Sequence, residues 1–128
     1  MGAVSFDLQA SARRLESAFP LHTEEGVRSF LEKLSSLEEL KYYTGDFDVV
    51  IWLADFYEVL FKVANLSQSE HKVIYYLYFE GYRQSELVEL LGLKKNTIHT
   101  LLTRAIKKIA SHYEYIRQLE EGEQHDNN

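Results

Sequence analysis

The 128-residue sequence contains no cysteine, only one proline and only six glycines. The lack of cysteine excludes disulfide frameworks, zinc sites with thiolate ligands and cysteine nucleophiles. The scarcity of proline and glycine favours helices over a turn-rich β fold. Because 45% of the residues are hydrophobic and 13% are aromatic, most of the chain can fold around a compact core. The length predicts one domain, or one domain with an accessory segment.

The sequence also shows no segment with the features of a targeting signal or a membrane span. Residues Met1 to Ala12 have no basic segment followed by an apolar block, so we expect no secretion signal. The most apolar run, Phe47 to Phe61, is interrupted by acidic residues and is too short to cross a membrane. We therefore expect a soluble cytoplasmic protein without a membrane partner.

No known pattern of catalytic or metal-binding residues is present. The histidines are scattered, and no two of them have the i, i+4 spacing of a metal-binding helix. The sequence has no glycine-rich phosphate loop, no carboxylate cluster and no nucleophile-elbow serine. We therefore expect no enzymatic activity, no metal ion and no cofactor.

The net charge of −6 hides a strong asymmetry along the chain. Residues 1–66 carry six basic and 11 acidic side chains, whereas residues 67–119 carry eight basic and five acidic ones. Residues 120–128 carry four acidic side chains and no basic one. The stretch from Lys94 to Lys108 holds five basic residues and no acid, which indicates either nucleic-acid contact or a solvated helix face.

The spacing of apolar residues predicts an all-α protein of six or seven helices. We expect helices over residues 6–19, 23–40, 46–65, 67–80 and 84–91, and another from residue 94 to about 122. Thr23 and Ser67 stand at N-cap positions, and Ser67 forms a capping-box pattern with Glu70. The helix over residues 46–65 is apolar almost all round, so it lies at the centre of the core, at a subunit interface, or both.

The stretch from Gln84 to Arg104 has the spacing of a helix-turn-helix. Gly92 supplies the tight turn, because a backbone position with positive φ favours glycine. The residues that we expect to be buried are Leu87, Leu90 and Leu91 on the first helix, Leu93 beneath the turn, and Ile98, Leu101, Leu102, Ala105 and Ile109 on the second. A helical hairpin with a solvated polar face fits the same spacing.

The other face of the second helix carries the side chains that a major-groove reader needs. Lys95, Asn96, His99 and Thr100 are candidates for base contacts, because the first turns of such a helix usually meet the base edges. Arg104, Lys107 and Lys108 lie farther along and suit phosphate contacts. The full candidate DNA-binding set is Lys94, Lys95, Asn96, Thr97, His99, Thr100, Thr103, Arg104, Lys107 and Lys108.

Several short motifs between Leu66 and Ile109 carry a resemblance to a known family. They are Leu66-Ser67-x-x-Glu70, Tyr78-Phe79-Glu80-Gly81, Gln84-Ser85-Glu86-Leu87, Leu91-Gly92-Leu93, Thr97-Ile98 and Arg104-Ala105-x-Lys107-Lys108-Ile109. Together they resemble region 4 of bacterial sigma factors, the helix-turn-helix module that binds the promoter −35 element. The resemblance implies a recognition helix over residues 94–108 and an RNA polymerase contact on the helix over residues 68–80.

The sequence departs from that family at Val88, where alanine is usual, and at Lys94, where serine commonly caps the recognition helix. Residues 1–65 lack the basic and aromatic segment with which a complete sigma factor melts and reads the −10 element. The chain is therefore similar to small phage and prophage regulators of the ArpU kind. We expect a helical accessory or oligomerisation region over residues 1–65, a DNA-binding domain over 66–119 and a disordered acidic tail over 120–128.

These observations predict a sequence-specific transcriptional regulator, an activator or sigma-like factor, that binds double-stranded DNA in a bacterial cell or a phage-infected host. RNA polymerase is a candidate partner. A second copy of the chain is another, because Leu102, Ala105, Ile109, His112, Ile116 and Leu119 follow a heptad spacing. Alternatively, Ile109, Tyr113 and Ile116 fold back on the amino-terminal helices. A phage small terminase subunit and a protein-binding region 4-like module are the alternative functions.

Overall fold

The computed structural model describes residues 17–44 and 47–126, and this part of the chain is helical without any strand. The expected all-α class is confirmed. The helix expected over residues 6–19 lies almost entirely outside the described residues. The elements are α2 (Glu24–Glu32), α3 (Leu34–Thr44), α4 (Phe47–Glu58), η1 (Val59–Val63), α5 (Gln68–Ile74), η2 (Tyr75–Phe79), α6 (Gln84–Leu91) and α7 (Lys95–Asp126), where η1 and η2 are π-helical turns.

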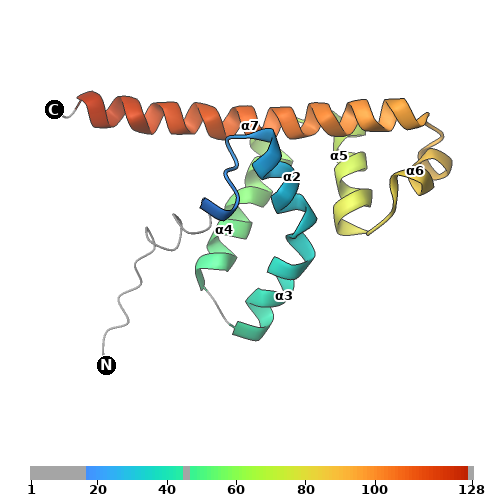
Figure 1. Cartoon of the computed structure of the whole chain (residues 1–128), viewed down its shortest axis with the longest axis horizontal. Helices are drawn as coiled ribbons and strands as arrows, with labels where there is room; N and C mark the ends of the chain where they lie inside the picture. The colour runs from blue at the N-terminus through green and yellow to red at the C-terminus, as the bar shows by residue number, and fades with distance from the viewer. Residues whose placement is uncertain (1–16, 45–46, 127–128) are drawn as a thin grey trace.

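The 32-residue helix α7 forms one long side of the molecule, and the other helices pack beneath it (Figure 1). Helices α2, α3 and α4 lie under its middle, and α5 and α6 lie under its amino-terminal end (Figure 1). The most extensive packing partners of α7 are α5 and α2. The division of the chain near residue 65 stays a prediction, and α7 contacts elements on both sides of it.

Local hydrogen bonds explain where the helices begin. The Thr23 hydroxyl accepts the Gly26 N–H at 3.0 Å and donates to the Pro20 carbonyl at 2.8 Å, so Thr23 caps α2 as expected. Ser67 and Glu70 form the expected capping box, in which Ser67 Oγ accepts the Glu70 N–H at 3.2 Å and Glu70 Oε1 accepts the Ser67 N–H at 2.9 Å.

The single helix expected over residues 23–40 is instead two helices, α2 and α3. At the junction, the Lys33 N–H bonds to the carbonyls of both Ser29 and Phe30, at 3.2 and 3.1 Å. The bond to Phe30 tightens the last turn of α2, because it closes a shorter ring than an α-helical bond. The apolar spacing continues across this junction, so the sequence pattern did not reveal it.

Aromatic rings form the core of the first half of the chain. The Phe30 ring lies between Phe56 and Trp52, with centroid distances of 4.4 and 4.8 Å. Helix α4 and η1 bury one face in this core, while Val50, Ile51, Phe61 and Val63 stay exposed. The helix that is apolar all round in the sequence therefore contributes one face to the core and leaves another in contact with solvent.

Helix α7 is buried along its first half and solvated along its second. The fully or nearly fully buried residues are Ile98, Leu102, Ala105, Ile106, Ile109 and Ala110. Ile116 and Leu119 are 37% and 47% exposed, so the heptad spacing spans a core segment and a surface segment. Tyr113 is half-buried and its hydroxyl donates to Asp55 of α4 at 3.4 Å, which ties α7 to the amino-terminal half of the chain.

The chain is helical through residues 120–126, where the sequence predicted a disordered tail. Arg117 pairs with Glu114 and Glu121, each at 3.3 Å, and these i, i+3 and i, i+4 ion pairs support a helix that has few core contacts. Among the described residues, no helix is long and apolar enough to cross a membrane.

Candidate nucleic-acid interface

The expected helix-turn-helix is formed by α6, the turn at Gly92 and the first half of α7. Gly92 has φ +66° and ψ +30°, the left-handed conformation predicted for it. Leu87 is completely buried, and Leu91 and Leu93 are partly buried against the core. Leu90 is 49% exposed, so its expected burial is wrong. At 100° per residue, Leu87, Val88 and Leu91 share the packed face of α6, and Leu90 points away from it.

The candidate DNA-binding residues, together called the candidate DNA-binding surface, lie mostly at solvent-exposed positions before and along the first half of α7. Nine of the ten are exposed, and Thr103 is half-buried. Ile98, Leu102 and Ala105 anchor the opposite face of α7 in the core. Helix α7 packs against α2, α5 and α6, so segments far apart in the sequence hold these residues in place. The residues themselves lie in the turn before α7 and in the first four turns of that helix.

The first turn of α7 leaves backbone donors directed outward. The Ile98 N–H bonds to the Lys94 carbonyl at 3.0 Å, which makes Lys94 the residue before the first helical turn. The N–H groups at the start of a helix have no intrahelical acceptor and can donate to an anion. The Thr100 hydroxyl donates to the Asn96 carbonyl at 2.9 Å, so its methyl group and its oxygen lone pairs remain available on the surface.

Lys108 differs from the other basic residues of this surface. Its ammonium lies 2.6 Å from Glu70 Oε1 and 3.5 Å from the Asn65 carbonyl oxygen. Burial raises the pKa of Glu70, but hydrogen bonds from Lys108 and Ser67 outweigh burial and leave the pKa below its ordinary value. Glu70 is therefore ionised at neutral pH and forms a charged pair with Lys108.

An aromatic cluster lies on α5, η1 and η2, apart from the candidate DNA-binding surface. Phe61, Tyr75 and Phe79 are 51%, 43% and 36% exposed. The Phe61 ring stacks on the His71 ring with a centroid distance of 5.8 Å, and its centroid lies 6.1 Å from that of Phe79. A groove of about 510 Å³ beside these rings is lined by Leu34, Ser35, Glu38, Tyr57, Phe61, Tyr78 and Phe79.

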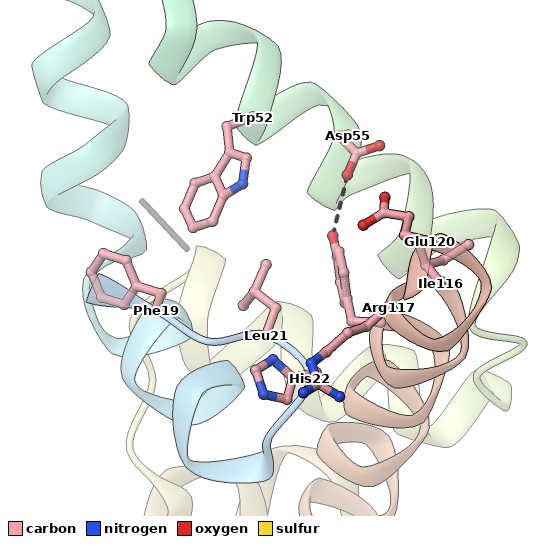
Figure 2. A pocket seen from close by; sticks show the side chains of 9 residues that line it. Phe19, Leu21, His22, Trp52, Asp55, Ile116, Arg117 and Glu120 are labelled. Atoms are coloured by element: carbon pink, nitrogen blue, oxygen red, sulfur yellow. Dashed lines mark hydrogen bonds between the residues drawn. The ribbon is translucent and has the colours of Figure 1, made fainter. Parts of the chain in front are cut away.

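A separate hollow of about 290 Å³ lies near the middle of α7 (Figure 2). It is lined by residues of three segments: Phe19, Leu21 and His22 before α2, Trp52 and Asp55 of α4, and Tyr113, Ile116, Arg117 and Glu120 of α7. The Tyr113 hydroxyl donates to Asp55 Oδ2 at 3.4 Å, and a dashed line at the Asp55 carboxylate marks this bond in Figure 2. Burial, and then the Asp55 carboxylate, raise the pKa of Tyr113, so this hydroxyl keeps its proton and holds α4 against α7.

The segment that carries the candidate DNA-binding surface matches a known protein family. Residues 58–109 match the family described as Sigma-70, region 4. This segment is a sigma region 4-like helix-turn-helix. The matched segment takes in η1, α5, η2, α6 and the first half of α7. Comparisons with curated proteins and with solved structures found no match.

The family indicates a DNA-binding helix-turn-helix protein of the sigma-like kind. Kinship with ArpU-like phage regulators stays a prediction. The described residues contain no group of three or more histidine, aspartate or glutamate side chains that could hold a metal ion.

Two features of the interface escaped the sequence analysis. Ile106 was left out of the expected buried stripe, although it is completely buried. The ion pair between Glu70 and Lys108 was also missed, because the two residues lie 38 positions apart and neither carries a local signal for the other. The capping box did place Glu70 at the start of a helix, but it gave no indication of a partner on α7.

Proposed function

We propose that the protein is a sequence-specific DNA-binding transcriptional regulator, an activator or sigma-like factor, which inserts the first half of α7 into the major groove. One observation carries this proposal. A row of exposed basic and amide side chains is fixed on a helix whose opposite face is buried, directly after a left-handed turn at Gly92. This arrangement is the geometry of a recognition helix.

The proposed contacts follow the position of each residue along α7. Lys95, Asn96, His99 and Thr100 meet the base edges, since they occupy the first turns and include an amide that can pair with adenine. Arg104 and Lys107 meet phosphates farther along the helix. Lys94, Thr97 and Thr103 flank this row and contact the DNA backbone. Lys108 has a different environment, which is taken up below.

The aromatic cluster supports a second proposed partner, bacterial RNA polymerase. Phe61, Tyr75 and Phe79 remain exposed although they are large and apolar, and exposed aromatic patches are typical of protein contact sites. The family resemblance assigns polymerase contact to residues 68–80, the segment that carries Tyr75 and Phe79. The proposed place of action is therefore the cytoplasm of a bacterial cell or of a phage-infected host.

A second copy of the chain is a further proposed partner. Ile116 and Leu119 are exposed near the end of α7, beyond the core that covers the first half of the helix. Light scattering of the purified protein measures this directly. A monomer would contradict the homodimer, and a ring-sized mass would instead support the terminase alternative.

The DNA-binding proposal is tested by selecting duplexes from a randomised library and measuring affinity for the selected site by fluorescence anisotropy. We expect the triple variant Lys95→Ala, Asn96→Ala and Arg104→Ala to lose roughly 100-fold or more in affinity, because it loses two base contacts at about 1–3 kcal/mol each and one phosphate contact. Arg117→Ala is the matched control on the same helix, since Arg117 pairs with Glu114 and Glu121. Equal affinity of the triple variant and the unaltered protein would contradict the proposal.

The proposed contact with RNA polymerase is tested by measuring transcription from the selected site with purified bacterial RNA polymerase. We expect Phe79→Ser to lower activation while leaving DNA affinity unchanged, because Phe79 lies off the recognition surface. Tyr115→Ser is the control, an exposed aromatic residue on the second half of α7. Activation that survives both the Phe79 change and the triple DNA-binding change would contradict both proposed contacts.

A further inference from the structure

Two adjacent lysines on α7 have different surroundings. Among the described residues, Lys107 makes no ion pair, whereas the Lys108 ammonium lies 2.6 Å from Glu70 Oε1. Successive helical residues point about 100° apart, so Lys107 can face solvent while Lys108 leans toward α5. Both residues are adjacent lysines, and the sequence analysis predicted phosphate contacts for both.

The partner of Lys108 is almost completely removed from water. Glu70 is 3% exposed, and its second carboxylate oxygen has no hydrogen-bond partner among the described residues. If Lys108 turned toward a phosphate, Glu70 would be left as a buried charge without a counterion, which is strongly unfavourable. The Lys108 side chain is itself 42% exposed, but its ammonium group is paired with Glu70.

The pair also joins segments that meet only in the folded protein. Glu70 closes the capping box at the start of α5, and Asn65, whose carbonyl lies 3.5 Å from Lys108, joins η1 to α5. Asn65 has φ +56°, a left-handed conformation that asparagine tolerates better than most residues. Lys108 thus connects α7 to the start of α5 and to the end of η1.

We infer that Lys108 is a positioning residue, which fixes the angle of the recognition helix through Glu70 and Asn65 and makes no phosphate contact. This inference rests on the proposed DNA binding. It also separates the basic residues of α7 into two kinds: Arg104 and Lys107 neutralise DNA phosphates, and Lys108 holds the helix that carries them.

Salt dependence distinguishes the two roles. Each phosphate contact contributes about 0.9 to the slope of log Kobs against log salt concentration. We therefore expect Lys107→Met to lower this slope by about 0.9, and Lys108→Met to leave it unchanged while affinity for the selected site falls about 2- to 30-fold. Methionine keeps the apolar stem of each lysine and removes only its charge.

The partner variant Glu70→Gln separates the roles further. If Lys108 positions α7 through Glu70, the change lowers affinity for the selected site by a factor similar to that of Lys108→Met. If Glu70 instead restrains a phosphate-binding lysine, the change frees Lys108 and raises both the affinity and the salt slope. Glu89→Gln on the exposed side of α6 is the control for removing one acidic charge near the DNA.

Unfolding in urea verifies the ion pair without DNA. We expect Glu70→Gln and Lys108→Met to be non-additive in a double-mutant cycle, whereas Glu70→Gln and Lys107→Met should be additive. The inference alone would be overturned if the unaltered protein binds DNA and Lys108→Met lowers the salt slope as much as Lys107→Met does. No DNA binding by the unaltered protein at any salt concentration would overturn the proposed function and this inference together.

Discussion

The turn of the helix-turn-helix depends on one residue without a side chain. An added Cβ at Gly92 would meet no atom within 4 Å, so only the left-handed backbone opposes substitution. We predict that Gly92→Ala lowers the free energy of unfolding by about 1–2 kcal/mol, the cost of placing an L side chain in that conformation. Urea unfolding followed by circular dichroism measures this change.

Gly122 provides the matched control, because the same substitution should have the opposite sign there. Gly122 lies within α7 and also has no atom within 4 Å of an added Cβ. Alanine is a better helix former than glycine, so Gly122→Ala should raise the free energy of unfolding by up to about 1 kcal/mol. Equal effects at the two glycines would contradict the left-handed turn at Gly92.

Glu70 should make the stability of the protein depend on pH in the acidic range. Its pKa is lowered in the folded state, so its stabilising contribution is complete above the ordinary carboxylate pKa of about 4.3. That contribution is lost as the pH falls further, through the folded pKa. We predict that Glu70→Gln weakens the fall in unfolding free energy below about pH 5, measured by urea unfolding across a pH series. Glu89→Gln, an exposed control on α6, should give a curve parallel to that of the unaltered protein.

At the scale of single residues, sequence patterns identified caps and turns but not long-range partners. Thr23, Ser67 and Gly92 have the roles expected of them, because a cap or a turn is decided by residues three or four positions apart. The partner of Lys108 could not be found in this way. It depends on how α5 packs against α7, which no local spacing describes.

The buried part of helix α7 ends near Tyr113, although the apolar spacing of the helix continues to Leu119. Ile106 is completely buried and Ile116 is 37% exposed. We predict that Ile106→Ala lowers the free energy of unfolding by about 2–5 kcal/mol, through lost burial and a residual cavity. Ile116→Ala should change it by about 0.5 kcal/mol or less.

Chemical denaturation of both variants under identical conditions compares these effects. A comparable loss of stability in the two isoleucine variants would mean that the second half of α7 has a covering partner. Concentration-dependent stability of the unaltered protein would then identify that partner as a second copy of the chain.

Glycine stop signals predicted some helix boundaries but not all of them. Gly81 and Gly92, both with positive φ, end helical segments where expected. The junction of α2 and α3 at Lys33 carries no glycine or proline signal, and α7 continues through Gly122 to Asp126. A glycine on an exposed helix lowers helix stability without having to end the helix.

The whole molecule should unfold as one cooperative unit, because α7 packs against both α2 and α5. The single tryptophan, Trp52, reports on the amino-terminal half, where it contacts Phe30. Leu87 lies in the region 4-like domain and is completely buried. We predict that Leu87→Ala shifts the urea midpoint of Trp52 fluorescence as far as that of far-ultraviolet circular dichroism.

Two separate unfolding transitions would contradict this prediction. If Trp52 fluorescence kept its midpoint while circular dichroism showed an earlier step, the amino-terminal half would unfold independently of the region 4-like domain. The shared helix α7 would then transmit no stability between the two halves.

The sequence by itself determined the all-α class, the caps, the left-handed turn and the basic face of α7. All of these depend on residues within a few positions of one another, where backbone geometry and helical periodicity act directly. The tertiary structure alone decided which half of α7 is buried, which residues of α6 pack, and which lysine is already paired. These features depend on contacts between helices that are distant in the chain, and burial of a charge such as Glu70 exists only once those helices have packed.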